Sequence, residues 1–115
     1  MKLWMQDEGD VAVVGLDASA DLMADGVAAF RAAFESLVTE RLRVVLDLSR
    51  VDGIDSSGLG TLVNLSRWVA ARGGELRLAA VSRPVEMVFE ITRLYRLFEI
   101  YGGVPEAVAS FEARA

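Results

Sequence analysis

One stretch decides the fold: residues 44–60, which read VVLDLSRVDGIDSSGLG. It opens with residues 44–48, a short apolar run rich in β-branched side chains, as in a strand at the centre of a sheet. Asp52-Gly53 is a turn dipeptide that would end such a strand. A helix then opens near Asp55 or Ser56, because both are favoured N-cap types and an apolar pattern with helical spacing follows.

Two glycines and two serines distinguish this helix start. Gly58 and Gly60 each cost roughly 1 kcal/mol relative to alanine in a helix, and the usual compensation is a close approach of backbones or N–H groups that meet an anion. One interpretation is a tight connection in which the glycines let the helix lie close to the sheet. The other is a site where Ser56 or Ser57, beside the Asp55 carboxylate, accepts a phosphoryl group. The residues themselves leave both interpretations open.

The segment Asp55–Gly60, preceded by LDLS at residues 46–49 and by Ile54, resembles the signature of anti-sigma factor antagonists, the STAS domain family. In that family the partner anti-sigma factor kinase phosphorylates the second serine, so the resemblance implies phosphorylation of Ser57. It also aligns Asp17 with the family's aspartate near the phosphorylation site. It covers residues 1–115 as one STAS domain, and similarity to the third helix and final strand rests on Pro84-Val85, Phe89, Thr92, Leu94 and Phe98.

Composition favours one α/β domain without catalytic chemistry of its own. A chain of 115 residues with 53% hydrophobic residues has room for one core and is too short for two. The net charge of -5 argues against binding to nucleic acid. Histidine and cysteine are absent, which removes the commonest catalytic base and the commonest zinc ligands. We therefore expect no enzymatic activity, no cofactor and no metal site.

The N-terminus predicts a cytoplasmic chain. Residues 1–8 turn acidic too early for a signal peptide, and no apolar run reaches the roughly 18 residues of a membrane span. We therefore expect no insertion into a membrane.

Strands and helices alternate along the chain. The expected strands are residues 3–5, 11–16, 44–48, 76–80 and 98–101, with a polar turn at 7–10. The expected helices begin at Ser19 or Asp25, at Asp55 or Ser56, at residues 82–84 and at residues 104–106; the second ends near Arg72. This alternation predicts a mixed, mostly parallel sheet of four to five strands with about four helices.

Apolar side chains at helical spacing predict the core-facing sides of these helices. They are Val27, Phe30, Phe34, Leu37 and Val38 in the first helix, Val85, Val88, Phe89 and Ile91 in the third, and Ala107, Val108 and Phe111 in the last. Leu65 and Trp68 form a stripe beside the core-facing side of the signature helix, where they either pack or contact a partner. Many relatives have glycine where this chain has Arg93, so that surface is a second candidate for partner contact.

The resemblance implies a regulatory binding module. In this interpretation the unphosphorylated chain binds an anti-sigma factor serine kinase, which frees a sigma factor, and phosphorylation at Ser57 ends the binding. We expect Ser56 rather than Ser57 to act as the helix cap, which leaves the Ser57 hydroxyl free to react. The alternative is a STAS scaffold subunit of a stress-sensing assembly or a lipid transporter, without a phosphorylation switch. As an oligomer we expect a monomer or a weak dimer.

Overall fold

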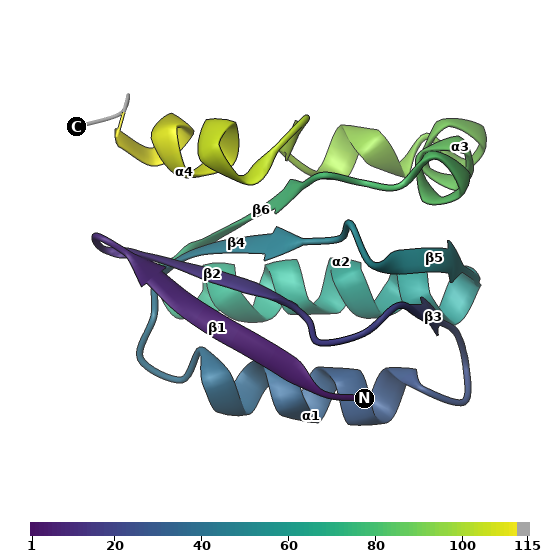
Figure 1. The fold of residues 1–115 in the computed structure, drawn as a ribbon, viewed down its shortest axis with the longest axis horizontal. Helices are drawn as coiled ribbons and strands as arrows, with labels where there is room; N and C mark the ends of the chain where they lie inside the picture. Colours follow the sequence, from purple (N-terminus) through teal and green to yellow (C-terminus); the bar gives the residue numbers. More distant parts are fainter. Residues whose placement is uncertain (113–115) are drawn as a thin grey trace.

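The structure is a computed structural model that describes residues 1–112. Within that range a mixed five-stranded sheet forms the centre, with strand order β1-β2-β4-β6-β7 (Figure 1). β1 is antiparallel to β2, and the other neighbours are parallel. The strands are β1 (Leu3–Glu8), β2 (Val11–Leu16), β4 (Arg43–Asp47), β6 (Glu75–Ala79) and β7 (Ile100–Tyr101). The predicted α/β fold with a mostly parallel sheet is confirmed.

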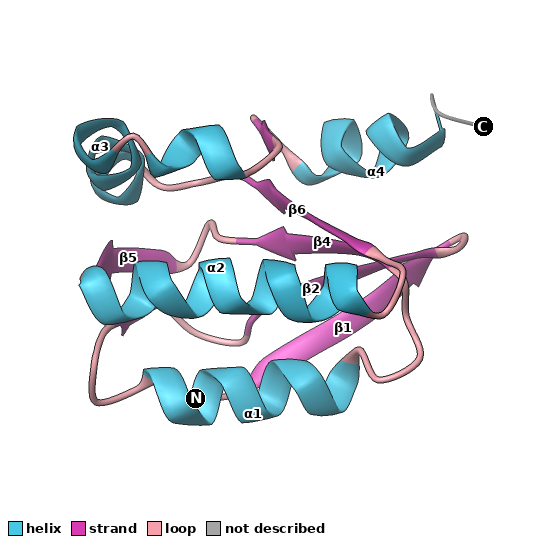
Figure 2. Cartoon of the chain, turned by 180° about the vertical axis from the view of Figure 1, so that it is seen from behind, coloured by secondary structure: helices cyan, strands magenta, loops and turns pink. Residues whose placement is uncertain are grey.

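Within residues 1–112 the chain forms four α-helices and a short 3-10 helix. They are α1 (Val27–Leu37), α2 (Ser56–Ala71), α3 (Arg83–Thr92), η1 (Leu94–Leu97) and α4 (Val104–Glu112). Figure 2 views the molecule from the side on which α1 and α2 cover the sheet. No helix in this part of the chain combines the length and the apolar character needed to cross a bilayer.

The two faces of the sheet bury different cores, because successive side chains of a strand point to opposite faces. Val44, Leu46 and Leu78 point toward the face that also buries Phe30 and Phe34 of α1. The predicted core side of α1 is therefore confirmed. The opposite face is covered by α4 and is smaller; its buried residues are Val11, Val13, Val45, Ala79, Ala107 and Phe111.

A second, two-stranded sheet was not expected. β3 (Ala20–Leu22) pairs with β5 (Val51–Ile54) in parallel. The prediction of a turn at Asp52-Gly53 is wrong, because these residues lie within β5 and Gly53 is opposite Asp21 of β3. The chain turns earlier, where the Val51 N–H donates to the Leu48 carbonyl at 3.0 Å. Pairing with a distant segment here overrides the local turn preference of Asp-Gly.

The start of α1, the end of β1 and one expected core residue of α3 also differ from the sequence prediction. α1 begins at Val27 with Gly26 as its N-cap, so the start at Ser19 is wrong and the start at Asp25 is two residues early. β1 runs on through Glu8, since all six of its residues pair with β2. In α3, Val85 and Phe89 are buried, but Ile91 points away from the core and is 78% exposed.

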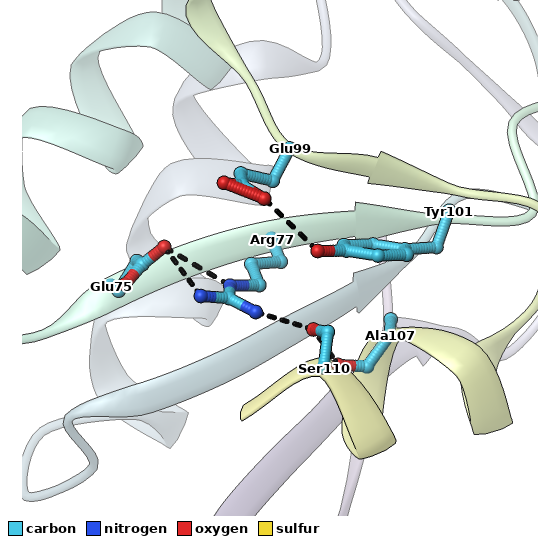
Figure 3. A network of polar contacts seen from close by, with 6 residues as sticks. All are labelled: Glu75, Arg77, Glu99, Tyr101, Ala107 and Ser110. Carbon is cyan, nitrogen blue, oxygen red and sulfur yellow. Dashed lines mark hydrogen bonds and ion pairs between the residues drawn. The ribbon is translucent and has the colours of Figure 1, made fainter. Parts of the chain in front are cut away.

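The face under α4 contains a buried charge, Arg77 of β6, whose side chain lies beside Ser110 of α4 (Figure 3). Arg77 is 1% exposed. Its Nε donates to the Glu75 carboxylate at 3.0 Å, and its Nη2 pairs with the same carboxylate by charge at 2.9 Å. Its Nη1 donates to the Ser110 hydroxyl, and the Phe111 ring centre lies 4.1 Å from the guanidinium carbon. Arg77 thus fastens α4 to β6 by directional contacts.

Candidate functional site

The candidate site is the junction between β5 and α2. Asp55 is the N-cap of α2, with extended backbone angles φ -111 and ψ -174. One carboxylate oxygen accepts from the Gly58 N–H at 2.9 Å, and the other accepts from the Ala24 N–H at 3.1 Å. The expectation that Ser56 is the cap is therefore wrong. Asp55 is the residue that keeps extended angles, while Ser56 already lies in the first turn of the helix.

The Asp55 carboxylate is held in its charged form. The hydrogen bond from the Gly58 N–H lowers the pKa of Asp55 most, partial desolvation opposes it, and the N–H groups of Ala24 and Ser57 lower it further. Hydrogen bonds to a carboxylate favour the ionised form. The Asp55 carboxylate therefore places a fixed negative charge at the start of α2. Its hydrogen bond from the Ala24 N–H also joins α2 to the loop that follows β3.

The two glycines of this turn differ in their surroundings. A Cβ atom at Gly58 would lie 2.1 Å from the Leu22 carbonyl oxygen and 2.6 Å from Cγ1 of Ile54. A Cβ atom at Gly60 would have no neighbour within 4 Å. The first interpretation of the glycines, close packing on a neighbouring backbone, therefore applies to Gly58. It does not explain Gly60, which is exposed.

Ser56 and Ser57 are both exposed. Within residues 1–112 neither hydroxyl takes part in a hydrogen bond. The Ser57 carbonyl accepts from the Thr61 hydroxyl at 2.9 Å, so the backbone of this residue is held while its hydroxyl stays free. The arrangement presents two unengaged hydroxyls on a rigid helix start beside a carboxylate.

Asp17 directly follows the carboxyl end of β2. Its carbonyl accepts from Nη1 of Arg50 at 2.9 Å, and it borders a hollow that Trp4, Asp47 and Ser49 also line. Among the described residues, Asp17 makes no hydrogen bond or ion pair with Asp55–Gly60. The described contacts of the helix start come from Leu22 and Ala24 instead.

The sequence pointed to neither Leu22 nor Ala24. β3 is only three residues long, and Ala24 contributes a backbone N–H that any residue but proline supplies. No local pattern marks such contacts.

The three residues proposed for partner contact lie in different settings. Leu65 is fully buried in the core, so the prediction that it contacts a partner is wrong. Trp68 is half-buried, packs edge-on against Phe34 with ring centres 6.5 Å apart, and lies 4.3 Å from the Arg72 guanidinium carbon. Arg93 is exposed at the end of α3 in the left-handed conformation, with φ +59. Partner contact by Trp68 and Arg93 stays a prediction.

The helix start presents the exposed Ser56 and Ser57 hydroxyls beside the Asp55 carboxylate. Within residues 1–112 no three carboxylate, histidine or cysteine side chains gather to hold a metal ion. The model of the STAS domain family matches residues 5–107.

The chain belongs to the STAS domain family. A Thermotoga neapolitana protein named as an anti-sigma factor antagonist homologue is 38% identical over 72 residues, which are 63% of this chain and 64% of that protein. The STAS chain spans 58–64% of the lengths of the curated relatives it matches.

Solved STAS structures have the same fold. The crystal structure of a Thermotoga maritima protein described as an anti-sigma factor antagonist has a TM-score of 0.82 at 27% identity, covering 94% of this chain and 92% of that one. The structure of the anti-sigma factor antagonist SpoIIAA in its unphosphorylated form has a TM-score of 0.76 at 20% identity, covering 97% of each chain. At 20% identity the second likeness shows the fold alone.

Proposed function

We propose that this chain is an anti-sigma factor antagonist that is switched by phosphorylation of Ser57. The observation that carries the proposal is the free, exposed Ser57 hydroxyl in the first turn of α2, in a chain of the STAS family. Its partner is an anti-sigma factor serine kinase, which the unphosphorylated chain binds in the cytoplasm. Binding of the kinase frees a sigma factor, and transfer of phosphate to Ser57 ends the binding.

The choice of Ser57 over Ser56 rests on the family signature, because both hydroxyls are exposed and unengaged. Helix capping does not distinguish the two serines, since Asp55 is the N-cap. Incubation with the kinase and Mg-ATP, followed by peptide mapping, tests the assignment. We expect one phosphate in wild type and in Ser56→Ala, and none in Ser57→Ala. Phosphate on Ser56 of the wild-type chain would contradict it.

The switch acts through charge at a docked surface. A phosphate adds about -1.5 to -2 charges, and the free N–H groups of a helix start offset such charge by a few tenths to about 2 kcal/mol. The fold should therefore tolerate phosphate at Ser57. Against a bound partner the phosphate must lose water beside the Asp55 carboxylate, which typically costs several kcal/mol. A penalty of about 3 kcal/mol weakens binding on the order of 100-fold.

Three proteins test this mechanism. Ser57→Ala should bind the kinase with wild-type affinity and resist switching, whereas Ser57→Asp should bind far more weakly. Binding is measured by titration calorimetry and stability by urea unfolding, where all three should have nearly the same midpoint. Full affinity in Ser57→Asp would contradict the charge switch and favour the scaffold alternative. Weak binding with a large fall in midpoint would also contradict it, because damage to the fold would then explain the loss.

The proposal assigns the phosphoryl transfer to the kinase and not to this chain. The sequence contains neither histidine nor cysteine, and no lysine motif for cradling phosphates. The purified chain with Mg-ATP should show no phosphate incorporation and no ATP hydrolysis. Phosphate appearing on the chain without kinase would overturn this assignment.

A further inference from the structure

The strand β1 forms one edge of the central sheet (Figure 1). It pairs with β2 over six consecutive residues without a bulge, and among the described residues no other strand pairs with it. Neither a proline nor a central charge blocks its free side, because residues 3–6 read LWMQ. The strand at the other end of the sheet, β7, has only two residues. The free side of β1, which we call the open edge, can therefore accept a further strand.

The hydrogen-bonding groups of β1 alternate between β2 and the open edge. The Asp17 N–H donates to the Lys2 carbonyl at 3.0 Å, and these residues form the next pair beyond the β1–β2 register. Opposite residues of antiparallel strands alternate between hydrogen-bonded and non-hydrogen-bonded pairs. Even-numbered residues of β1 therefore bond to β2, while the N–H and C=O groups of Leu3, Met5 and Asp7 point to the open edge. Within residues 1–112 no hydrogen bond from another segment reaches these six groups, which we call the open groups.

The open groups are arranged symmetrically about Met5. When two copies of β1 lie antiparallel with Met5 opposite Met5, Leu3 of each copy is opposite Asp7 of the other. All six open groups of one copy then have hydrogen-bonding partners in the other copy. A shift of this register by one residue would place open groups opposite groups that already bond to β2, and a shift by two would move one end of β1 beyond the partner strand.

The charges of β1 fit the same register. Lys2 precedes the strand and Glu8 ends it; both are exposed, and among the described residues neither has an ion pair. With Met5 opposite Met5, Lys2 of each copy is opposite Glu8 of the other, in a non-hydrogen-bonded pair, where side chains lie closer. Opposite charges in such pairs stabilise two strands. A parallel arrangement would place like charges side by side, so the charges favour the antiparallel one.

We propose that the open edge binds β1 of a second copy of this chain, which joins two five-stranded sheets into one about a two-fold axis at Met5. A second copy is favoured over a strand of another protein because the open groups and the charges of one edge complement those of an identical edge, as an isologous contact requires. A contact of one strand is small, so we expect weak association. The proposal concerns a part of the chain other than Ser57 and does not rest on the proposed function.

Sedimentation equilibrium of the full chain tests the association. Between about 10 μM and about 1 mM, the average mass of wild type should rise from 12.5 kDa toward twice that value. Met5→Pro removes the N–H at the centre of the open edge, a change that edge strands tolerate, and should weaken dimerisation by at least about tenfold. A wild-type mass that stays at the monomer value over this range overturns the proposal, even if the open edge pairs with a strand of another protein.

Hydrogen exchange of the wild-type amides, followed by NMR, locates the contact. Between about 50 μM and about 1 mM, exchange should slow with concentration at Leu3, Met5 and Asp7, whose N–H groups become bonded in the dimer. Exchange at Trp4 and Gln6 should change far less, because β2 already protects these amides in the single chain. Slowing that does not follow this alternation would reject pairing at the open edge.

A charge exchange tests the register. Lys2→Glu makes both charged ends of β1 acidic, and Glu8→Lys makes both basic. Each variant alone should dimerise about tenfold more weakly, because like charges then face each other, while an equimolar mixture should regain the wild-type association. Arg67→Glu is the matched control for Lys2→Glu, since it makes the same charge change at an exposed site of α2 and should leave dimerisation unchanged.

Two results would reject the open edge even if the chain dimerises. One is dimerisation that neither Met5→Pro nor the charge variants weaken, which would place the contact elsewhere. The other is a mixture of Lys2→Glu with Glu8→Lys that associates as weakly as each variant alone, which would refute the register centred on Met5.

Discussion

Gly58 and Gly60 are two residues apart in α2 but face different surroundings. Gly58 lies against the Leu22 carbonyl, while Gly60 faces open space. Both glycines have the same intrinsic cost in a helix, so what compensates this cost must differ between the two positions. At Gly58 the fold requires that no side chain be present, because a Cβ atom would overlap the Leu22 carbonyl. At Gly60 no neighbour among the described residues requires the absence of a side chain. Ser57 is exposed in the same turn. We call the side of this turn that faces Leu22 its inner side, and the side with Ser57 and Gly60 its outer side. The inner side stabilises the fold, and the outer side is exposed and available for binding.

The largest expected effect comes from breaking the inner side. In Gly58→Ala the new methyl group would meet the Leu22 carbonyl and Ile54, so α2 must shift away from β3. Overpacking of this kind costs about 3 kcal/mol when backbone has to move. Urea unfolding should show a clear fall in midpoint. A midpoint equal to that of wild type would show that the junction is looser than the distances indicate.

A smaller effect is expected from Asp55→Asn, and it should depend on pH. Because the folded state lowers the pKa of Asp55, its carboxylate stabilises the fold above the unfolded pKa of about 3.9. This stabilisation disappears as the pH falls through the lower, folded-state pKa. Wild type should therefore exceed Asp55→Asn in urea midpoint at pH 7, and the two should converge as the pH falls below the folded-state pKa of Asp55. A gap that persists unchanged at low pH would exclude the charge as its cause.

A gain is expected on the outer side. Gly60→Ala adds a methyl group in open space to an ordinary helical position, so it should stabilise the isolated chain by up to about 1 kcal/mol. The comparison of Gly58→Ala with Gly60→Ala under the same conditions is the direct test of the two sides. Equal losses in both variants would show that Gly60 also has a structural role in the chain.

The smallest effect on stability is expected at Ser57. Because its hydroxyl is exposed and unengaged, Ser57→Ala should change the free energy of unfolding by no more than about 0.5 kcal/mol. A loss well beyond that value would mean that the hydroxyl supports the helix start.

Sequence reasoning succeeded where local patterns dominate. The apolar runs of β2 and β4 and the helical spacing of Phe30 and Phe34 predicted those elements, because a buried strand or helix side repeats with a fixed period. It failed at β3 and β5, where three or four residues are held by pairing with a distant segment. Asp52-Gly53 has the composition of a turn, and only the partner strand keeps it extended.

The candidate site shows the same limit. The position of the helix start and the presence of two serines could be predicted, since N-caps and glycines have local preferences. The choice between Asp55 and Ser56 as cap could not, because both are favoured cap types and the Ala24 N–H that also binds the Asp55 carboxylate lies 31 residues away in the sequence. Leu65 was placed beside the core-facing side of α2 and is instead within it, since the buried stripe of this helix is wider than the pattern indicated.

The buried Arg77 determines which helices could replace α4 in this chain. The buried guanidinium of Arg77 donates to the Ser110 hydroxyl and lies over the Phe111 ring, so α4 supplies both of these contacts. A transplanted helix without those groups would leave a guanidinium covered and poorly paired, which is strongly destabilising. A chimaera made from this chain should therefore exchange β6 and α4 together.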